Sequence, residues 1–272
     1  MAAGVIKAGV TKDCATAIPR RRVAAVSSDR AVRIAAAING LAQAEGVPVS
    51  IRHVSQACAD AVDAVGVAVY LISEFGLGEP LYATDPVSEH ITELQVTLGE
   101  GPATMALEEH RPILEPDMTG VHAQRTWPLF GPESVADGVL GVFAFPLTMG
   151  AIAVGALEIY RPRTGPLSAT ELDDAFVFSD MAMQLILDAV DDDPAMMEAT
   201  LLASDFGLRW AELHQAVGMV SAQLDSEVTT AFLRLRAHAF RTGRRLLSVA
   251  DDVVNGRLRF DEESSDDSEP TP

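Results

Sequence analysis

Five arginines lie close together near the C-terminal end of the chain: Arg234, Arg236, Arg241, Arg244 and Arg245. Guanidinium groups bind phosphates through two parallel hydrogen bonds, and they also stack on nucleobases. Arg234, His238 and Arg241 are spaced three and four residues apart, which places them along one side of a helix. The spacing therefore predicts an anion-binding ridge. A solvated helix face with cations near its C-terminal end has the same pattern.

The cluster stands out because the chain as a whole is acidic. Its 272 residues carry a net charge of -19, which should repel nucleic acid and anionic membranes. Residues 205–260, however, hold eight arginines against six acidic residues, and the last twelve residues hold six acids. The positive charge is thus concentrated in one segment near the C-terminal end.

No pattern in the sequence indicates catalysis or metal binding. There is no CxxC, HExxH or GxSxG motif, and GEGPAT at 99–104 lacks the Lys-Ser/Thr ending of a phosphate-binding loop. Pro102 is instead expected at the first position of a helix. Cys58 falls on the apolar side of an expected helix and should be a buried thiol. We expect a cytoplasmic protein that is not an enzyme and that needs no cofactor, metal or membrane.

The first two thirds of the chain combine helical and strand patterns. Helical spacing covers 30–46, 49–65 and 168–190, and Ser168 with Glu171 has the pattern of a capping box. Strand patterns lie at 67–73, 81–85, 111–116, 140–148 and 152–161. These elements predict an α+β fold, an antiparallel sheet flanked by helices, over residues 29–190.

The remaining third has helical patterns only. Three amphipathic segments predict a three-helix bundle over 205–260, with Gly243 ending the second helix. Gly218 lies inside the first helix, where it costs about 0.5–1 kcal/mol relative to alanine. Because glycine has no side chain, either another helix or the backbone of a ligand should approach this part of the helix closely. We assign the other segments as a flexible leader (1–28), a linker (191–204) and an acidic disordered tail (261–272).

The segment LHQAVGMVSAQLDSEVTTAFLRLRAHAFRTGRRLLSVADDVVNGRLRF closely resembles the ANTAR domain, a three-helix RNA-binding module of bacterial transcription antiterminators. The match covers about 206–260, with the family's AxG on Ala216 and Gly218 and its VA..VV on the third helix. Many members have a lysine where this chain has Val217. The resemblance implies binding to hairpin loops of nascent transcripts. With the arginine pattern, it assigns the expected RNA contacts: Gln215, Gly218, Met219, Arg234, Arg236, His238, Arg241, Arg244 and Arg245.

The preceding domain is similar to GAF sensor domains, on LQVTLGEGPATMALEEHRPILEPDM at 94–118 and the order of its elements. This resemblance implies an unidentified small-molecule ligand that controls the output domain, and a homodimer that would set the spacing of two RNA sites. Aromatic residues that would line the ligand pocket, or else simply pack the core, are Tyr70, Trp127, Phe143, Phe145 and Tyr160.

Two other functions remain open from the sequence. The C-terminal bundle would act as a helix-turn-helix in a DNA-binding regulator, although its second helix begins with SEVTTAF and its arginines come late. Alternatively, the bundle only pairs with another protein chain. Exposure of Phe240 and Met219 would favour this last function.

Overall fold

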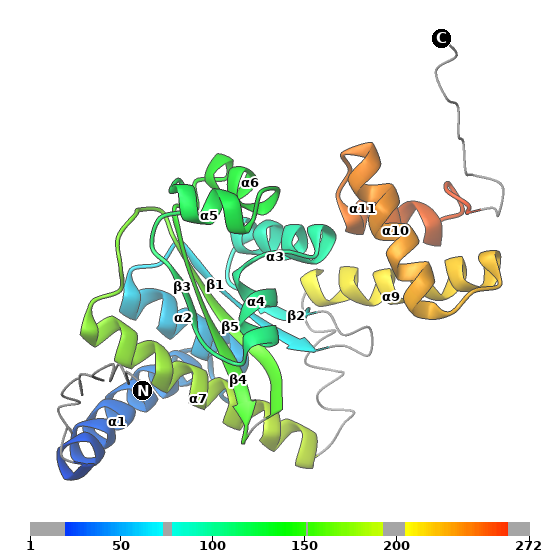
Figure 1. The fold of residues 1–272 in the computed structure, drawn as a ribbon. Coiled ribbons are helices and arrows are strands. Elements are labelled where there is room, and N and C mark those ends of the chain that lie inside the picture. Colours follow the sequence, from blue (N-terminus) through cyan, green and yellow to red (C-terminus); the bar gives the residue numbers. More distant parts are fainter. Residues whose placement is uncertain (1–19, 73–77, 151, 193–204, 261–272) are drawn as a thin grey trace, which may run out of the picture.

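The computed structural model describes residues 20–72, 78–150, 152–192 and 205–260. A five-stranded antiparallel sheet has the order β2-β1-β5-β4-β3, and helices cover both of its faces (Figure 1). The strands are β1 (Gly66–Ile72), β2 (Gly78–Ala83), β3 (Ile113–Glu115), β4 (Gly141–Met149) and β5 (Ile152–Arg161). The expected antiparallel sheet flanked by helices is therefore confirmed.

Alternation along the strands separates two hydrophobic layers. Val67 and Val69 of β1 face one side, where α1 (Arg20–Glu45), α2 (Ile51–Val62) and α7 (Ala169–Asp192) pack. Ala68 and Tyr70 face the other side, which is covered by α3 (Pro86–Leu98), α4 (Pro102–Glu109), α5 (Val121–Thr126) and α6 (Phe130–Ala136). This period of two follows from the pleat of a strand, and here both faces are buried.

Local signals fix the ends of several helices. Asp85 accepts hydrogen bonds from the backbone N–H groups of Val87 and Ser88, and Pro86 is the first residue of α3. Gly99 ends this helix in the left-handed conformation, with φ of 70°. The expected capping box of α7 is confirmed, because Ser168 and Glu171 each accept a hydrogen bond from the other's backbone N–H.

The central strand β5 carries an acidic residue, Glu158, among apolar neighbours. Its partners in the register are Ala68 on β1 and Ala144 on β4, so small side chains flank it on both sides. Three residues earlier, Gly155 lies so close to β1 that a Cβ there would stand 2.1 Å from the carbonyl oxygen of Tyr70. The middle of the sheet thus combines close backbone approach with one buried carboxylate.

Residues 205–260 form a three-helix bundle, which we call the C-terminal bundle. Its helices are α9 (Asp205–Leu224), α10 (Val228–Thr242) and α11 (Leu246–Val254). Leu213, Val217, Leu235 and Val249 are buried between them. Gly243 ends α10 with φ of 62°, as its position in the sequence predicts.

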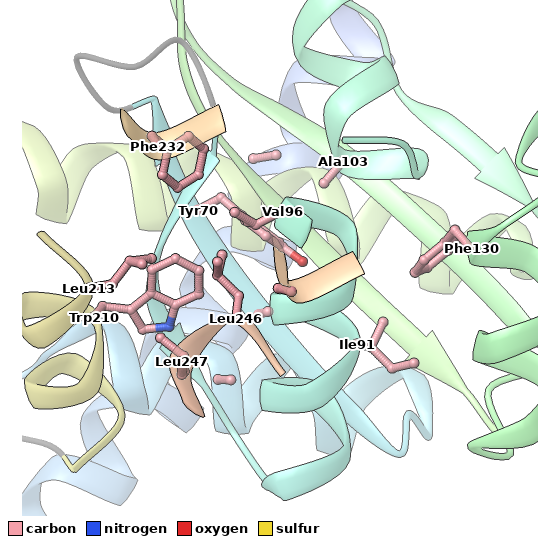
Figure 2. Close-up of a cluster of buried hydrophobic side chains, with 14 of the residues drawn as sticks. Tyr70, Ile91, Val96, Ala103, Phe130, Trp210, Leu213, Phe232, Leu246 and Leu247 are labelled. Carbon is pink, nitrogen blue, oxygen red and sulfur yellow. The ribbon is translucent and has the colours of Figure 1, made fainter. Parts of the chain in front are cut away.

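The C-terminal bundle packs against the sheet domain, by which we mean residues 20–192. Helix α9 contacts β2, while α10 and α11 contact α3. Trp210, Leu213 and Leu246 of the bundle share one hydrophobic cluster with Tyr70 and Val96 of the sheet domain (Figure 2). The two parts are therefore joined by an apolar interface as well as by polar contacts.

Two expected segments differ from the structure or fall outside it. Helix α1 begins at Arg20, so the expected flexible leader 1–28 is wrong over its last nine residues, and residues 1–19 lie outside the described part. Helix α7 continues to Asp192, which takes in the start of the expected linker. Residues 193–204 and 261–272 are also outside the described part. Among the described helices, none combines the length and apolarity needed to cross a membrane.

Candidate functional site

A group of polar side chains is buried between the sheet and α3. Glu158 Oε2 accepts hydrogen bonds from Tyr70 OH (2.9 Å), Tyr160 OH (2.6 Å) and the Gln95 side-chain amide. Thr92 Oγ1 lies 3.1 Å from Tyr70 OH and 3.2 Å from Tyr160 OH. We call these five residues the Glu158 cluster. Strands β1 and β5 contribute three of them, and α3 contributes the other two.

The electrostatics of the Glu158 cluster are those of a carboxyl group removed from water. Burial raises the pKa of Glu158 to about 7, although the hydrogen bonds from Tyr160, Gln95 and Tyr70 oppose this rise. Burial also raises the pKa of Tyr70 and Tyr160 well above the usual value, and the Glu158 charge adds to that effect. The second carboxylate oxygen, Oε1, is buried without a hydrogen-bond partner. The Glu158 cluster therefore has an unused acceptor in the core of the domain.

The aromatic residues expected to line one pocket lie on two faces of the sheet. Tyr70, Tyr160 and Trp127 are buried on the face covered by α3 and α4. Phe143 and Phe145 point to the opposite face and join the layer formed with α2 and α7. Side chains alternate between the two faces of the sheet along β4, which places both phenylalanines on this opposite face. The expectation that these two residues line the pocket was therefore wrong. Only Tyr70 and Tyr160 belong to the Glu158 cluster.

The arginine cluster is divided between the domain interface and the free surface. Arg245 forms an ion pair with Glu93 of α3, and its Nε lies 2.7 Å from Glu93 Oε2. The Glu93 side chain is only 2% exposed, whereas that of Arg245 is 43% exposed. Glu93 Oε1 also accepts the backbone N–H of Leu247 at 2.9 Å. One carboxylate thus binds both the guanidinium and the first turn of α11.

Arg236 contacts the C-terminal end of α3. Its Nε donates to the carbonyl oxygen of Thr97 at 3.1 Å, and its guanidinium carbon lies 5.8 Å from the centre of the Phe232 ring. A Cβ on Gly99 would stand 2.1 Å from an Arg236 nitrogen, so this close contact depends on glycine. Burial lowers the pKa of Arg236. A cation at a helix C-terminus is favoured by the helix dipole.

The other arginines of the arginine cluster pair within the bundle or are exposed. Arg244 donates to Asp252 of α11 at 2.6 Å. His238 packs edge-to-face against Phe260, and burial together with the charges of Arg241 and Arg244 lowers its pKa. Within the described residues, Arg234 and Arg241 are exposed and form no ion pair or side-chain hydrogen bond. The five arginines therefore do not form one surface open to a ligand, since Arg236 and Arg245 are bound to the sheet domain, whereas the ridge of Arg234, His238 and Arg241 stays a prediction.

On α9, the expected RNA contacts differ in their accessibility. Gln215 and Gly218 are exposed, and Met219 is partly buried against the bundle core. A Cβ on Gly218 would meet nothing within 4 Å, so none of the described helices packs closely against it. Val217, which lies between Ala216 and Gly218, is 1% exposed. Its side chain fills the core and is not available to a ligand.

The sequence reasoning missed α3 and the acidic residues that meet the bundle or the cluster. These are Glu89, Glu93 and Glu158, of which Glu89 pairs with Arg209 of α9. A signal for α3 was present, because Asp85 followed by Pro86 is a strong helix start. Glu158, an acid within the apolar strand pattern of 152–161, was a signal as well. Among the described residues, no group of three or more His, Cys, Asp or Glu is arranged to hold a metal ion.

Solved structures similar to this chain include GAF domains of two phosphoenolpyruvate-protein phosphotransferases. The Acinetobacter domain is 14% identical and matches 61% of this chain and 96% of its own, with a TM-score of 0.45. The Coxiella burnetii domain is 15% identical over 59% and 96%, with a TM-score of 0.44. A far-red absorbing dark state with bound biliverdin is 11% identical over 59% and 99%, with a TM-score of 0.40. The likeness is one of fold, over more than half of the chain.

No family model matches the sequence. The curated proteins likewise include no match.

Proposed function

We propose that the chain is a signal-dependent RNA-binding regulator of transcription antitermination. In this proposal the sheet domain is a GAF-like sensor, and the C-terminal bundle is an ANTAR-like output domain that binds hairpin loops in nascent transcripts. The observation that carries the proposal is the outward face of α10, where Arg234 and Arg241 are free of partners in the described structure. A chain with net charge -19 would otherwise repel RNA.

Apolar surface next to these arginines supports the same function. Leu233 is 52% exposed and Phe240 is 55% exposed, and the two are seven residues apart on α10. Exposed aromatic rings stack on unpaired bases, while adjacent guanidinium groups bind the phosphates. Exposure of Phe240 also fits a bundle that pairs with another chain, so the test has to separate RNA from protein partners.

The exposed surface of α9 at Gly218 adds a second line of support. Gly218 has open space around it, which leaves room for the backbone of a ligand to approach. A helix-turn-helix would instead read DNA with the start of its second helix. In α10 that start is Val228, Thr229 and Thr230, and the two free arginines come later. The arrangement favours RNA over duplex DNA.

Binding of the full-length protein to short RNA hairpins with randomised loops, compared with duplex DNA, tests this function. The double variant Arg234→Gln/Arg241→Gln should weaken RNA binding and lower the slope of log K against log salt by about 1.4, roughly 0.7 for each phosphate contact. The matched control is Arg125→Gln/Arg163→Gln, which changes the net charge equally on the sheet domain. Equal loss in both double variants, or tighter binding to duplex DNA, would contradict the assignment.

For the sensor, we propose that the Glu158 cluster receives a small molecule that forms a hydrogen bond with Glu158 Oε1. The unpartnered Oε1 of Glu158 supports this, because a buried polar atom without a partner is costly and a polar group on the ligand would satisfy it. A thermal-shift screen of small metabolites on the wild-type protein and on Glu158→Gln tests the idea. A ligand that stabilises both proteins equally does not bind through the carboxylate.

A homodimer would place two such bundles side by side and raise the effective concentration of the second RNA site. The oligomeric state stays a prediction. Sedimentation velocity of the protein, alone and with RNA carrying one or two hairpins, measures it directly. A protein that remains monomeric on both RNAs would remove the dimer from the proposal.

A further inference from the structure

The N-terminus of α11 has the features of an anion-binding site. Its first residues are Leu246 and Leu247, and the side chain of its N-cap residue, Arg245, forms no hydrogen bond with the backbone N–H groups of this first turn. Such groups bind carboxylates and phosphates, and the helix dipole favours negative charge there. The Arg245 guanidinium lies at the same place, so the site combines a backbone donor with a two-pronged cation.

An anion from the other domain occupies this site. Glu93 Oε1 accepts the Leu247 N–H at 2.9 Å, and Glu93 Oε2 accepts the Arg245 guanidinium. The carboxylate is almost completely buried there, at 2% exposure. A carboxylate and a phosphate present similar pairs of oxygens to an arginine. Glu93 therefore occupies a position whose two donors suit an anion with paired oxygens.

We propose that the site formed by Arg245 and the Leu247 amide is a phosphate-binding site for RNA, and that Glu93 occupies it as an intramolecular competitor. This inference rests on the proposed function. The interface around it has the same character, because Glu89 pairs with Arg209 and Arg236 binds the Thr97 carbonyl. In the docked arrangement three arginines of the bundle are held by α3, and only part of the cationic surface is free.

Helix α3 also provides a route from the sensor core to this site. Thr92 and Gln95 belong to the Glu158 cluster, whereas Glu93, between them, binds the bundle. A helix moves as a rigid element, so a change in the hydrogen bonds of the cluster shifts Glu93 relative to α11. An occupant of the Glu158 cluster would in this way control whether RNA can replace the carboxylate.

The test uses the full-length protein with Glu93→Gln, which keeps the size of the side chain and removes the charge. Two further variants serve as controls. Glu89→Gln loosens the same interface through Arg209 but leaves Glu93 in the site. Glu109→Gln removes one exposed carboxylate of α4, which pairs with Arg111 of the sheet domain. Affinity for the pool of randomised-loop RNA hairpins is measured for each at fixed salt.

We expect Glu93→Gln to raise RNA affinity about tenfold, because it increases the fraction of molecules with an open site. Glu109→Gln should change it less than twofold. The gain should disappear in Glu93→Gln/Arg245→Gln, and Glu89→Gln should show a smaller gain than Glu93→Gln. Unchanged affinity in a folded Glu93→Gln, with RNA binding intact in the wild type, would overturn the inference while leaving the proposed function standing.

If no variant binds RNA, the proposed function fails. A second measurement then tests the anion site at α11 independently of RNA. Hydrogen exchange of the Leu247 amide is followed in Glu93→Gln with and without inorganic pyrophosphate. Slower exchange with pyrophosphate, absent in Glu93→Gln/Arg245→Gln, supports an anion site at α11. No protection by pyrophosphate would overturn the site itself. Should Glu93→Gln not fold, faster exchange across α3 in the wild-type protein on RNA binding reports the same competition, and unchanged exchange contradicts it.

Discussion

Replacing Glu158 with glutamine should change how the stability of the protein depends on pH. The pKa of Glu158 is about 7 in the folded protein, against a reference value of 4.5. Between these values the folded state keeps a proton that the unfolded state has released, so stability falls as pH rises from 4.5 to 7 and is level above 7. Each unit of pKa difference corresponds to about 1.4 kcal/mol, which gives a total of about 3 kcal/mol.

Urea unfolding of the wild type and of Glu158→Gln between pH 5 and 8.5 measures this effect. The free energy of unfolding of the wild type, relative to Glu158→Gln, should decrease by about 2.5 kcal/mol over that range. Tyr70 and Tyr160 stay neutral throughout, because burial raises both pKa values further above 10. Groups elsewhere titrate in both proteins and cancel. A difference that stays constant with pH would refute the assignment of a protonated, buried carboxyl group.

Three further predictions concern stability and reactivity. Gly218→Ala and the matched Gly40→Ala should each raise the free energy of unfolding by about 0.5–1 kcal/mol, since both glycines are helical with open space around them. Only Gly218→Ala should also weaken RNA binding, and equal RNA affinities of the two variants would argue against RNA contact at α9. Arg161→Met should lower the free energy of unfolding by about 3 kcal/mol in urea unfolding, because Arg161 is buried and donates twice to the carbonyl oxygen of Val62. The exposed control Arg163→Met should lower it by less than about 1 kcal/mol. Similar losses in the two variants would contradict this prediction. Burial raises the pKa of Cys58, so peptide mapping should find it unalkylated by iodoacetamide until the protein unfolds; modification of the native protein would show that the helix layer opens.

The sequence predicts those elements that have a local signal. The alternation in VAVYLIS corresponds to β1, and the Ser168–Glu171 pair caps α7 as expected. Glycine 243 ends α10 for a reason that is equally local, the left-handed conformation after a helix. Each of these features depends on residues a few positions apart, so periodicity and turn chemistry are sufficient to find them.

The candidate sites could be predicted only in part, because they depend on distant contacts. Glu93 and Arg245 are 152 residues apart in sequence, and no local pattern pairs them. Alternation alone also does not say which face of a sheet a given helix covers, so Phe143 and Phe145 were assigned to the wrong side. The sequence shows that positive charge is concentrated near the C-terminal end of the chain. Which arginines bind α3 and which remain on the free surface depends on the fold.

The alanines beside Glu158 have a consequence for how the core can change state. Ala68 and Ala144 stand beside Glu158 on the two neighbouring strands, so the acidic side chain of the central strand is flanked by small side chains. In the proposed sensor, a change in the hydrogen bonds of Glu158 would therefore pass outward through side chains and a single helix, α3.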